Sequence, residues 1–318
     1  MMTNRCFRRL TGLLVLAALV ACHTNVDEFV PNPDRPDPGK RFRGRLFMEA
    51  RPAAQVFTLS ADTDTVLTTP AGVQVELRLA DWQRTDGGTA PTPVRAEVHV
   101  LTRPGDWLRF RHPTTDAEAK LLAAGGQLAV RLTQDNVPLA LRPGAAFTYR
   151  FPTARTDWTV RDGNATTLPD FTTAFAWTTG STIPTVTDWT IANSSYTGLG
   201  WPGTSAAWQQ LSRTLPTTTP TTEICVELRG HAATEAVVFA YFPGRPALAE
   251  LYETDVAGTF CYAGAPLTDS VHYLAIAEPG LDSYAWAIKS ETVAAGNPVV
   301  LDPQPLTLAA LLTQLNNL

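Results

Sequence analysis

The stretch that decides the fold is Val73-Gln74-Val75-Glu76-Leu77-Arg78-Leu79, in which apolar and polar residues alternate strictly. A period of two puts the two sets of side chains on opposite faces of a β-strand, so the pattern predicts a strand with one buried face. The runs 94–100 and 128–132 repeat the alternation, and turn-forming clusters lie beside them at 85–88 and 134–136. Several short strands at this spacing predict an antiparallel β-sandwich.

The strand pattern returns toward the C-terminus, where apolar and polar residues alternate over 224–228 and apolar runs occupy 237–242 and 273–276. The final segment, Leu306–Leu318, is rich in Leu and Ala and predicts a short terminal helix. We expect a short helix or turn over Thr115–Ala123, where Thr115 or Asp116 can cap it and two glycines can end it. A further short helix is expected over Ala206–Leu215.

The composition excludes two broad classes of protein. With 44% hydrophobic and 17% charged residues, the 318-residue chain is too apolar to be disordered. Its net charge is −5, and removing residues 1–21, which carry three Arg and no acidic residue, makes it −8. An acidic chain of this kind does not neutralise phosphates, so we expect no nucleic-acid partner.

The N-terminus carries the most specific signal. Arg5, Arg8 and Arg9 precede an apolar run over 10–20 that is too short to span a bilayer, as in a secretory signal peptide. The run ends in Leu19-Val20-Ala21-Cys22, which resembles the lipobox of bacterial lipoproteins. This resemblance implies cleavage after residue 21, lipidation of Cys22 and attachment to a membrane through the lipid. The alternative is a buried apolar segment that happens to end in Cys.

The residues after the lipobox indicate a spacer and a destination. Residues 22–40 include a Pro-rich stretch that cannot form a regular element and should extend stiffly. His23 stands where inner-membrane lipoproteins carry a retention Asp, so the resemblance implies the outer membrane, on its periplasmic or cell-surface side. The expected organisation is a signal peptide (1–21), a Pro-rich spacer (22–40), a first sandwich (41–152), a Thr- and Trp-rich middle segment (153–222) and a C-terminal sandwich with a terminal helix (223–318).

The fold class is therefore expected to be mostly β, with tandem antiparallel β-sandwiches and a short C-terminal helix. The order Pro70-Ala71-Gly72, Pro113-Thr114 and Leu121–Gly126 resembles a β-sandwich of uncharacterised bacterial surface lipoproteins that is distantly similar to the ZU-type sandwich. Some relatives cleave themselves at a His-Phe-Ser step, which Arg111-His112-Pro113-Thr114 lacks. The region from Glu223 resembles a carboxypeptidase-regulatory or transthyretin-like module.

The four cysteines divide into three groups. Cys6 leaves with the signal peptide, Cys22 is the lipidation site, and Cys225 and Cys261 remain. An even pair in an oxidising compartment predicts a disulfide. The alternatives are two buried free thiols or a catalytic cysteine, and the absence of a Cys-x-x-Cys spacing speaks against redox catalysis.

No local motif indicates an enzyme. The chain lacks a His-x-x-x-His or Cys-x-x-Cys zinc spacing, a Gly-x-Ser-x-Gly elbow, a Walker loop and a calcium loop. We therefore expect no catalytic residues, no metal site and no cofactor, although a carboxylate pair assembled in space would leave no local trace. His99 lies on a predicted strand on the face opposite Val98 and Val100, where we expect it to face solvent.

Tryptophans indicate a ligand surface or a core. Five of them, at 158, 177, 189, 201 and 208, fall within 51 residues. Sugar rings stack on flat aromatic side chains, which makes Trp201, Trp177 and Trp189 the candidate ligand-binding residues. The alternative is burial, because Trp is highly buried on average.

These patterns favour a non-enzymatic cell-envelope lipoprotein for adhesion, scaffolding or partner binding, with an unknown protein or glycan ligand. The alternative is a glycan-binding accessory lipoprotein of a polysaccharide uptake system that uses the middle segment. Asp64-Thr65-Val66 and Asp269-Ser270-Val271 each resemble a bacterial O-glycosylation acceptor, which makes Thr65 and Ser270 candidate modification sites.

Overall fold

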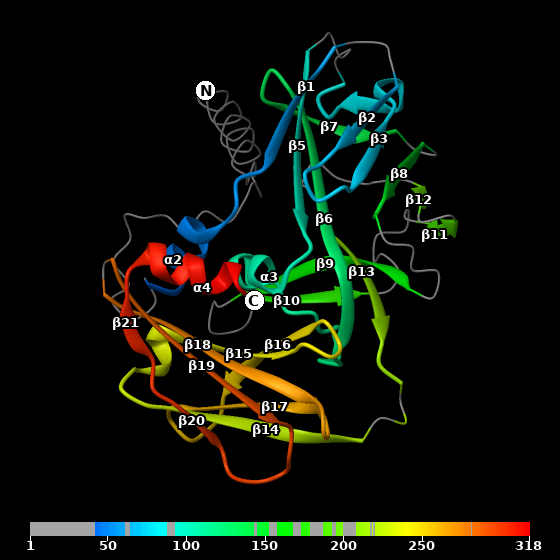
Figure 1. Ribbon diagram of the computed structural model, residues 1–318. Helices are drawn as coiled ribbons and strands as arrows, with labels where there is room; N and C mark the ends of the chain where they lie inside the picture. The colour runs from blue at the N-terminus through cyan, green and yellow to red at the C-terminus, as the bar shows by residue number, and fades with distance from the viewer. Residues whose placement is uncertain are drawn as a thin grey trace, which may run out of the picture. The chain divides into compact units, whose positions relative to one another are not determined.

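The structure is a computed structural model that describes most of the chain after residue 41 (Figure 1). The described residues are 42–60, 64–87, 93–142, 145–152, 158–167, 173–178, 187–192, 195–199, 208–216, 218, 220–280 and 282–318. Strands dominate and a short helix ends the chain, which confirms the predicted mostly β fold. Among these residues, no helix has the length and apolar character needed to cross a membrane.

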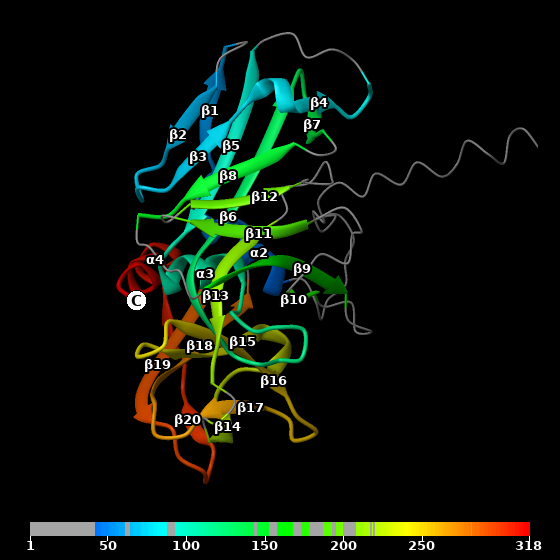
Figure 2. The same cartoon turned by 90° about the vertical axis from the view of Figure 1, so that its right-hand side faces the viewer.

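Two sheets form the first sandwich. One has the strand order β1-β5-β6-β13-β9-β10, with β7 also pairing with β6 and β4 with β7, and the other has the order β11-β12-β8-β3-β2. Figure 2 shows β8, β12 and β11 side by side. The strands of the first sheet are β1 (Gln55–Leu59), β4 (Trp82–Arg84), β5 (Val94–Leu101), β6 (Leu122–Gln134), β7 (Val137–Leu141), β9 (Thr159–Thr167), β10 (Thr173–Thr178) and β13 (Gln209–Thr214). Those of the second are β2 (Thr65–Thr68), β3 (Gln74–Leu77), β8 (Ala146–Arg150), β11 (Thr187–Ala192) and β12 (Ser195–Leu199).

The alternating stretch Val73–Leu79 contains β3, as its pattern predicted. Val73, Val75 and Leu77 are buried, while the intervening residues are at least partly exposed. These side chains join the alternating residues of β5 and β6 in one hydrophobic core, where each contributes about 1.5–3 kcal/mol by leaving water. The strand ends earlier than predicted, because a 3₁₀ turn (η1, Leu79–Asp81) begins at Leu79.

Strands β9 to β13 of the middle segment belong to the first sandwich and not to a separate region between two sandwiches. Strands β9, β10 and β13 lie in its first sheet, and β11 and β12 lie in its second. The helix predicted over Ala206–Leu215 is wrong, because Gln209–Thr214 forms β13 between β6 and β9. Pairing with β6 and, over Gln209–Ser212, with β9 outweighs the weak helix propensity of so short a segment.

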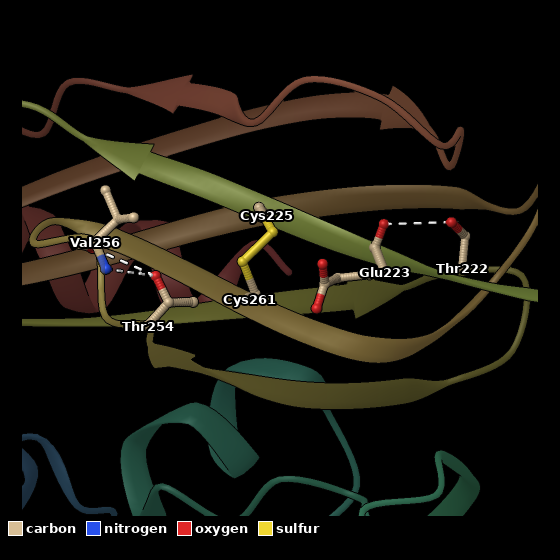
Figure 3. The surroundings of a disulfide bond; sticks show 6 residues. All are labelled: Thr222, Glu223, Cys225, Thr254, Val256 and Cys261. Carbon is tan, nitrogen blue, oxygen red and sulfur yellow. Dashed lines mark hydrogen bonds between the residues drawn. A yellow bond between two sulfur atoms is a disulfide. The ribbon is translucent and has the colours of Figure 1, made fainter.

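A third sheet, with the order β20-β14-β17-β16-β15-β18-β19-β21, folds around a second hydrophobic core to which residues of β14, β15, β17, β18 and β20 contribute. It departs from the expected antiparallel pattern at one pair, since β14 and β20 run parallel. A disulfide joins β14 to β17 (Figure 3). The strands are β14 (Thr221–Leu228), β15 (Ala236–Phe242), β16 (Ala247–Glu253), β17 (Thr259–Pro266), β18 (Ser270–Gly280), β19 (Ser283–Thr292), β20 (Val299–Leu301) and β21 (Gln304–Leu306), with a 3₁₀ turn η2 (Ala233–Glu235) before β15.

Three helices cover the other face of this third sheet. They are α2 (Phe42–Ala50), α3 (Pro104–Phe110) and α4 (Leu308–Asn316), and their apolar residues form a third core with Phe239, Leu274 and Trp286. All residues of β15 are buried because cores lie on both of its faces. The terminal helix α4 confirms the prediction, and Thr307 caps its first turn through a hydrogen bond from the Ala310 amide.

Of the helix or turn predicted over Thr115–Ala123, the structure contains the turn, and a helix occurs earlier, at α3. Pro104 is well suited to the first turn of a helix, and Arg111 ends it in the left-handed conformation with a φ of 52°. The predicted segment forms an Asx turn, in which Asp116 Oδ1 accepts hydrogen bonds from the amides of Glu118 and Lys120. Residue 122 then begins β6.

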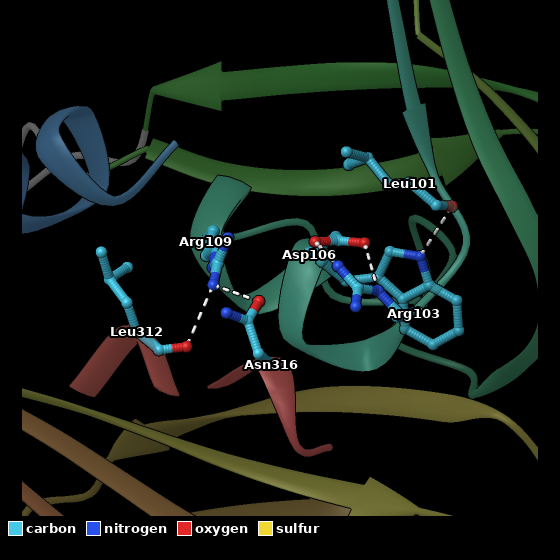
Figure 4. Close-up of polar contacts among 7 residues, drawn as sticks. Leu101, Arg103, Asp106, Arg109, Leu312 and Asn316 are labelled. Atoms are coloured by element: carbon cyan, nitrogen blue, oxygen red, sulfur yellow. Dashed lines mark hydrogen bonds and ion pairs between the residues drawn. The ribbon is translucent and has the colours of Figure 1, made fainter. Parts of the chain in front are cut away.

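Helices α3 and α4 pack closely. Arg109 Nη2 donates to Leu312 O at 3.1 Å and to Asn316 Oδ1 at 2.6 Å (Figure 4). Gly105 has no side chain where the backbone of α4 approaches, and a Cβ there would lie 1.7 Å from Leu315 O. Only glycine fits this position, so the first sandwich and the end of the chain meet through direct backbone contact.

The loop after α3 continues this junction onto β16. The Thr114 amide donates to Leu248 O at 2.7 Å, and the Leu248 amide donates to Thr114 Oγ1 at 2.8 Å. Arg111 forms a two-pronged ion pair with Glu250, whose Oε1 and Oε2 each lie 3.1 Å from Arg111 Nε. The first and C-terminal sandwiches are therefore joined by buried hydrogen bonds and an ion pair as well as by the helices.

Candidate functional site

A row of buried polar side chains crosses three neighbouring strands of the first sandwich. Gln210 of β13 is the register partner of both Gln127 on β6 and Arg161 on β9. Register partners in antiparallel strands point to the same face, with Cβ atoms about 5 Å apart. All three residues are buried, in a sheet whose opposite face carries the apolar core residues Leu128, Val160 and Leu211.

Hydrogen bonds connect this row to His112 in the loop after α3. His112 Nδ1 lies 3.2 Å from Gln127 Oε1, and Gln127 Nε2 donates to Gln210 Oε1 at 3.0 Å. Because a carbonyl oxygen only accepts, His112 Nδ1 carries the proton in this contact. Burial lowers the pKa of His112 to about 3, although the hydrogen bond with Gln127 opposes the shift. The imidazole is therefore neutral near pH 7.

Aromatic rings surround His112. Its ring stacks on Phe175 with centroids 3.9 Å apart and meets the edge of Trp208 at 4.7 Å. His99 also packs on this cluster, at 5.3 Å from the ring of Phe110, and is partly buried. The expectation that His99 faces solvent is therefore wrong, because α3 and Trp208 cover that face of β5.

Trp177 belongs to the same cluster and is fully buried. Its Nε1 donates to Pro113 O at 2.8 Å, so both the apolar faces and the polar edge of the ring contact other residues of the protein. The expectation that Trp177 binds a ligand is not met, because no face of the ring reaches solvent. The burial alternative holds for this residue.

The other predicted site residues are distributed differently. Trp189 lies in β11, but its side chain is outside the described part of the structure, as are Trp201 and the lipidation site Cys22. Thr65 is partly buried on β2, and Ser270 is exposed at the start of β18. Glycan stacking on Trp189 or Trp201, lipidation of Cys22 and glycosylation of Thr65 or Ser270 therefore stay predictions.

Cys225 and Cys261 form the predicted disulfide. They are direct register partners on β14 and β17, with Cα atoms 4.2 Å apart. Both are partly exposed, because the alternate residues Ile224 and Val226 point into the core. The carboxylate of Glu223 lies within 4.8 Å of both sulfur atoms, but two bonded sulfurs offer no thiolate to a metal ion.

Arg161 at the end of the polar row is the group that sequence reasoning missed. Its side chain is 7% exposed, and its Nη2 donates to Thr214 Oγ1 at 2.7 Å. Burial lowers the pKa of its guanidinium, and the charge of Asp116 opposes that shift. No local pattern marked the row, because the same faces of β6 and β13 also carry the polar residues Arg131, Ser212 and Thr214, and the members of the row meet only in space.

The resemblances to bacterial lipoproteins, to the ZU-type sandwich and to the carboxypeptidase-regulatory module rest on sequence patterns. They stay predictions, because no family model matches this chain and no curated protein matches it.

Proposed function

We propose that this chain is a lipid-anchored cell-envelope protein whose two joined sandwiches serve as a rigid partner-binding body and not as an enzyme. The observation that carries the proposal is the junction. A shared apolar core, the Thr114–Leu248 hydrogen bonds and the Arg111–Glu250 ion pair hold the sandwiches together. A body built in this way presents its surfaces at fixed positions, as a scaffold or adhesion module requires.

The buried acidic side chains support a structural role. Asp106 pairs with Arg103, Glu250 pairs with Arg111, and Glu278 accepts a hydrogen bond from the Leu46 amide. Each of these contacts tethers a helix or the loop after α3. Charges used in this way are not available as the paired acid and base that glycoside hydrolysis needs.

The anchor is tested by metabolic labelling with a clickable fatty acid, followed by membrane fractionation of cells that make wild type or Cys22→Ser. We expect wild type to carry the label and to sediment with the outer membrane, and Cys22→Ser to lose both properties. Cys6→Ser is the matched control and should behave as wild type. An unlabelled wild-type protein would overturn the anchor.

Partner binding is tested by cross-linking on intact cells with wild type and with Arg111→Ala, which loosens the junction without touching either sandwich core. We expect a defined cross-linked species with wild type that declines several-fold with Arg111→Ala at equal protein abundance. Absence of any cross-linked species from wild type would overturn the binding proposal, and an unchanged yield with Arg111→Ala would overturn the role of the junction.

A further inference from the structure

The row of polar side chains that begins at His112 ends in hydrogen-bond donors that have no acceptor. Gln210 Oε1 accepts the hydrogen bond from Gln127 Nε2, and the Nε2 group of Gln210 itself has no acceptor. Arg161 Nε and Ser212 Oγ likewise have no hydrogen-bond partner. Arg161 is the cross-strand neighbour of Gln210, and Ser212 follows Gln210 by two residues on the same face of β13.

These three side chains are all more than nine-tenths buried: Gln210 and Ser212 are 0% exposed and Arg161 is 7% exposed. Leaving a buried donor without an acceptor costs about 1–3 kcal/mol, and more when the donor is charged. Natural folds therefore seldom keep several such groups together without something that binds them. A bound acceptor would satisfy the three groups.

The positive charge of the Arg161 guanidinium also lacks an ion-pair partner among the described residues. Among the residues that the structure describes, no carboxylate forms an ion pair with Arg161. Asp116 contributes its charge from a distance, while its Oδ1 accepts two backbone amides of its own turn. Asp162 follows Arg161 directly in β9, so its side chain points to the opposite face of the sheet. A ligand with a negative charge would supply the missing balance.

The surroundings limit the size of such a ligand. Gly163 lies two residues beyond Arg161, and a Cβ there would be 2.5 Å from Phe175 Cζ and 2.9 Å from Trp177 Cζ3, so aromatic rings fill that side. On the other side, the Arg161 guanidinium contacts Thr214, which is exposed. The guanidinium is thus hydrogen-bonded to an exposed residue, while rings fill the space beside Gly163 on the same strand.

We propose that Arg161, Gln210 and Ser212 form a binding site for one small oxyanion group, a carboxylate, phosphate or sulfate. The guanidinium Nε and the Gln210 amide donate to the oxygens of the anion, and the Ser212 hydroxyl provides a third donor. Charge-assisted hydrogen bonds of this kind are about twice as strong as neutral ones, and the burial of the three residues strengthens them further.

The first test is thermal melting of the purified full-length protein in acetate, phosphate or sulfate against chloride, at equal ionic strength. We expect at least one oxyanion to raise the wild-type Tm by about 3 °C more than it raises the Tm of Arg161→Met. In chloride, Arg161→Met should melt higher than wild type, because it removes a buried charge. The matched control Arg213→Met changes an exposed arginine on the neighbouring strand β13 and should keep the full response to the oxyanion.

If the side-chain amides of Gln127 and Gln210 were both turned round, so that Oε1 and Nε2 exchange places, the opposite results would be expected. Gln210 Oε1 would then accept from Arg161, and the site would need no ligand. In that case Arg161→Met melts lower than wild type in every salt and no oxyanion gives a specific shift, which would overturn the proposal.

Calorimetric titration decides the matter even if Arg161→Met fails to fold. Wild type should bind one equivalent of the preferred anion, and Gln210→Leu should bind it about fivefold to tenfold more weakly. The rank of acetate against phosphate and sulfate identifies whether the natural group is a planar carboxylate or a tetrahedral oxyanion. Absence of saturable binding by all three anions to wild type would refute the site.

Discussion

The two sandwiches of this protein bury different kinds of residue. In the C-terminal sandwich, β15 is apolar along its whole length and has a hydrophobic core on each face. In the first sandwich, the central strands β6, β13 and β9 have an apolar face and an opposite face that carries buried Gln127, Gln210 and Arg161. The C-terminal sandwich is thus specified mainly by the burial of apolar area, and the first one also by the pairing of particular polar groups.

This difference shows how one region of a chain can contribute mainly to stability while another contains the groups suited to binding. Apolar contacts are non-directional and tolerate volume-conserving changes, whereas a buried polar row requires each partner in place. A binding group can therefore be built into the first sandwich, while the C-terminal sandwich serves as its support. Four variants test this division, from the one that disturbs both regions to the one that affects only the polar row.

Gly105→Ala should have the largest effect, because the new Cβ would lie 1.7 Å from Leu315 O and push α4 away from α3. We expect a loss of more than about 4 kcal/mol in the free energy of unfolding, measured by chemical denaturation. Gly244→Ala, where nothing lies within 4 Å of the added atom, is the control and should change stability little. Wild-type stability of Gly105→Ala would show that the two helices are not in contact.

Arg111→Ala should cost about 3–5 kcal/mol, because it leaves the Glu250 carboxylate, 5% exposed, without its partner. The exposed pair Arg229–Glu227 offers a control, and Arg229→Ala should change stability by less than about 1 kcal/mol. Denaturant titration of both variants gives the two values. Equal effects would mean that the junction pair is as solvated as the surface pair.

Replacing both Cys225 and Cys261 by Ser should lower stability by about 3–4 kcal/mol, since the bond links residues 36 positions apart and restricts the unfolded chain. Reduction of the wild-type protein should produce the same loss in thermal melting. A double variant that melts like the oxidised wild type would contradict this expectation.

His112→Phe should change the pH dependence of stability more than its value at pH 7. The folded pKa of about 3 lies below the unfolded value, so the unfolded chain binds a proton first as the pH falls. The contribution of neutral His112 is complete above about pH 6.5 and declines by about 1.4 kcal/mol per pH unit below it. Denaturation at pH 7 and pH 5 should show a flatter slope for His112→Phe, and parallel slopes would refute the neutral buried imidazole.

The strands were predictable where one face alone is buried. The alternation at Val73–Leu77 and Val94–Val98, the terminal helix and the disulfide pair all follow from local pattern or composition. The helix predicted over Ala206–Leu215 could not be corrected from the sequence, because its strand conformation depends on β6 and β9, which come from earlier in the chain. The fate of Trp177 was also undecidable, since exposure depends on what packs against it.

The amino-acid sequence alone establishes a mostly β chain, the periodicity of its strands and a pair of cysteines suited to a disulfide, because these depend on neighbours within a few residues or on composition. The tertiary structure decides that strands β9 to β13 of the middle segment complete the first sandwich and that His112, Gln127, Gln210 and Arg161 meet in one row. The physical reason is that strand pairing and the burial of polar groups are interactions between distant parts of the chain, and no local pattern encodes them.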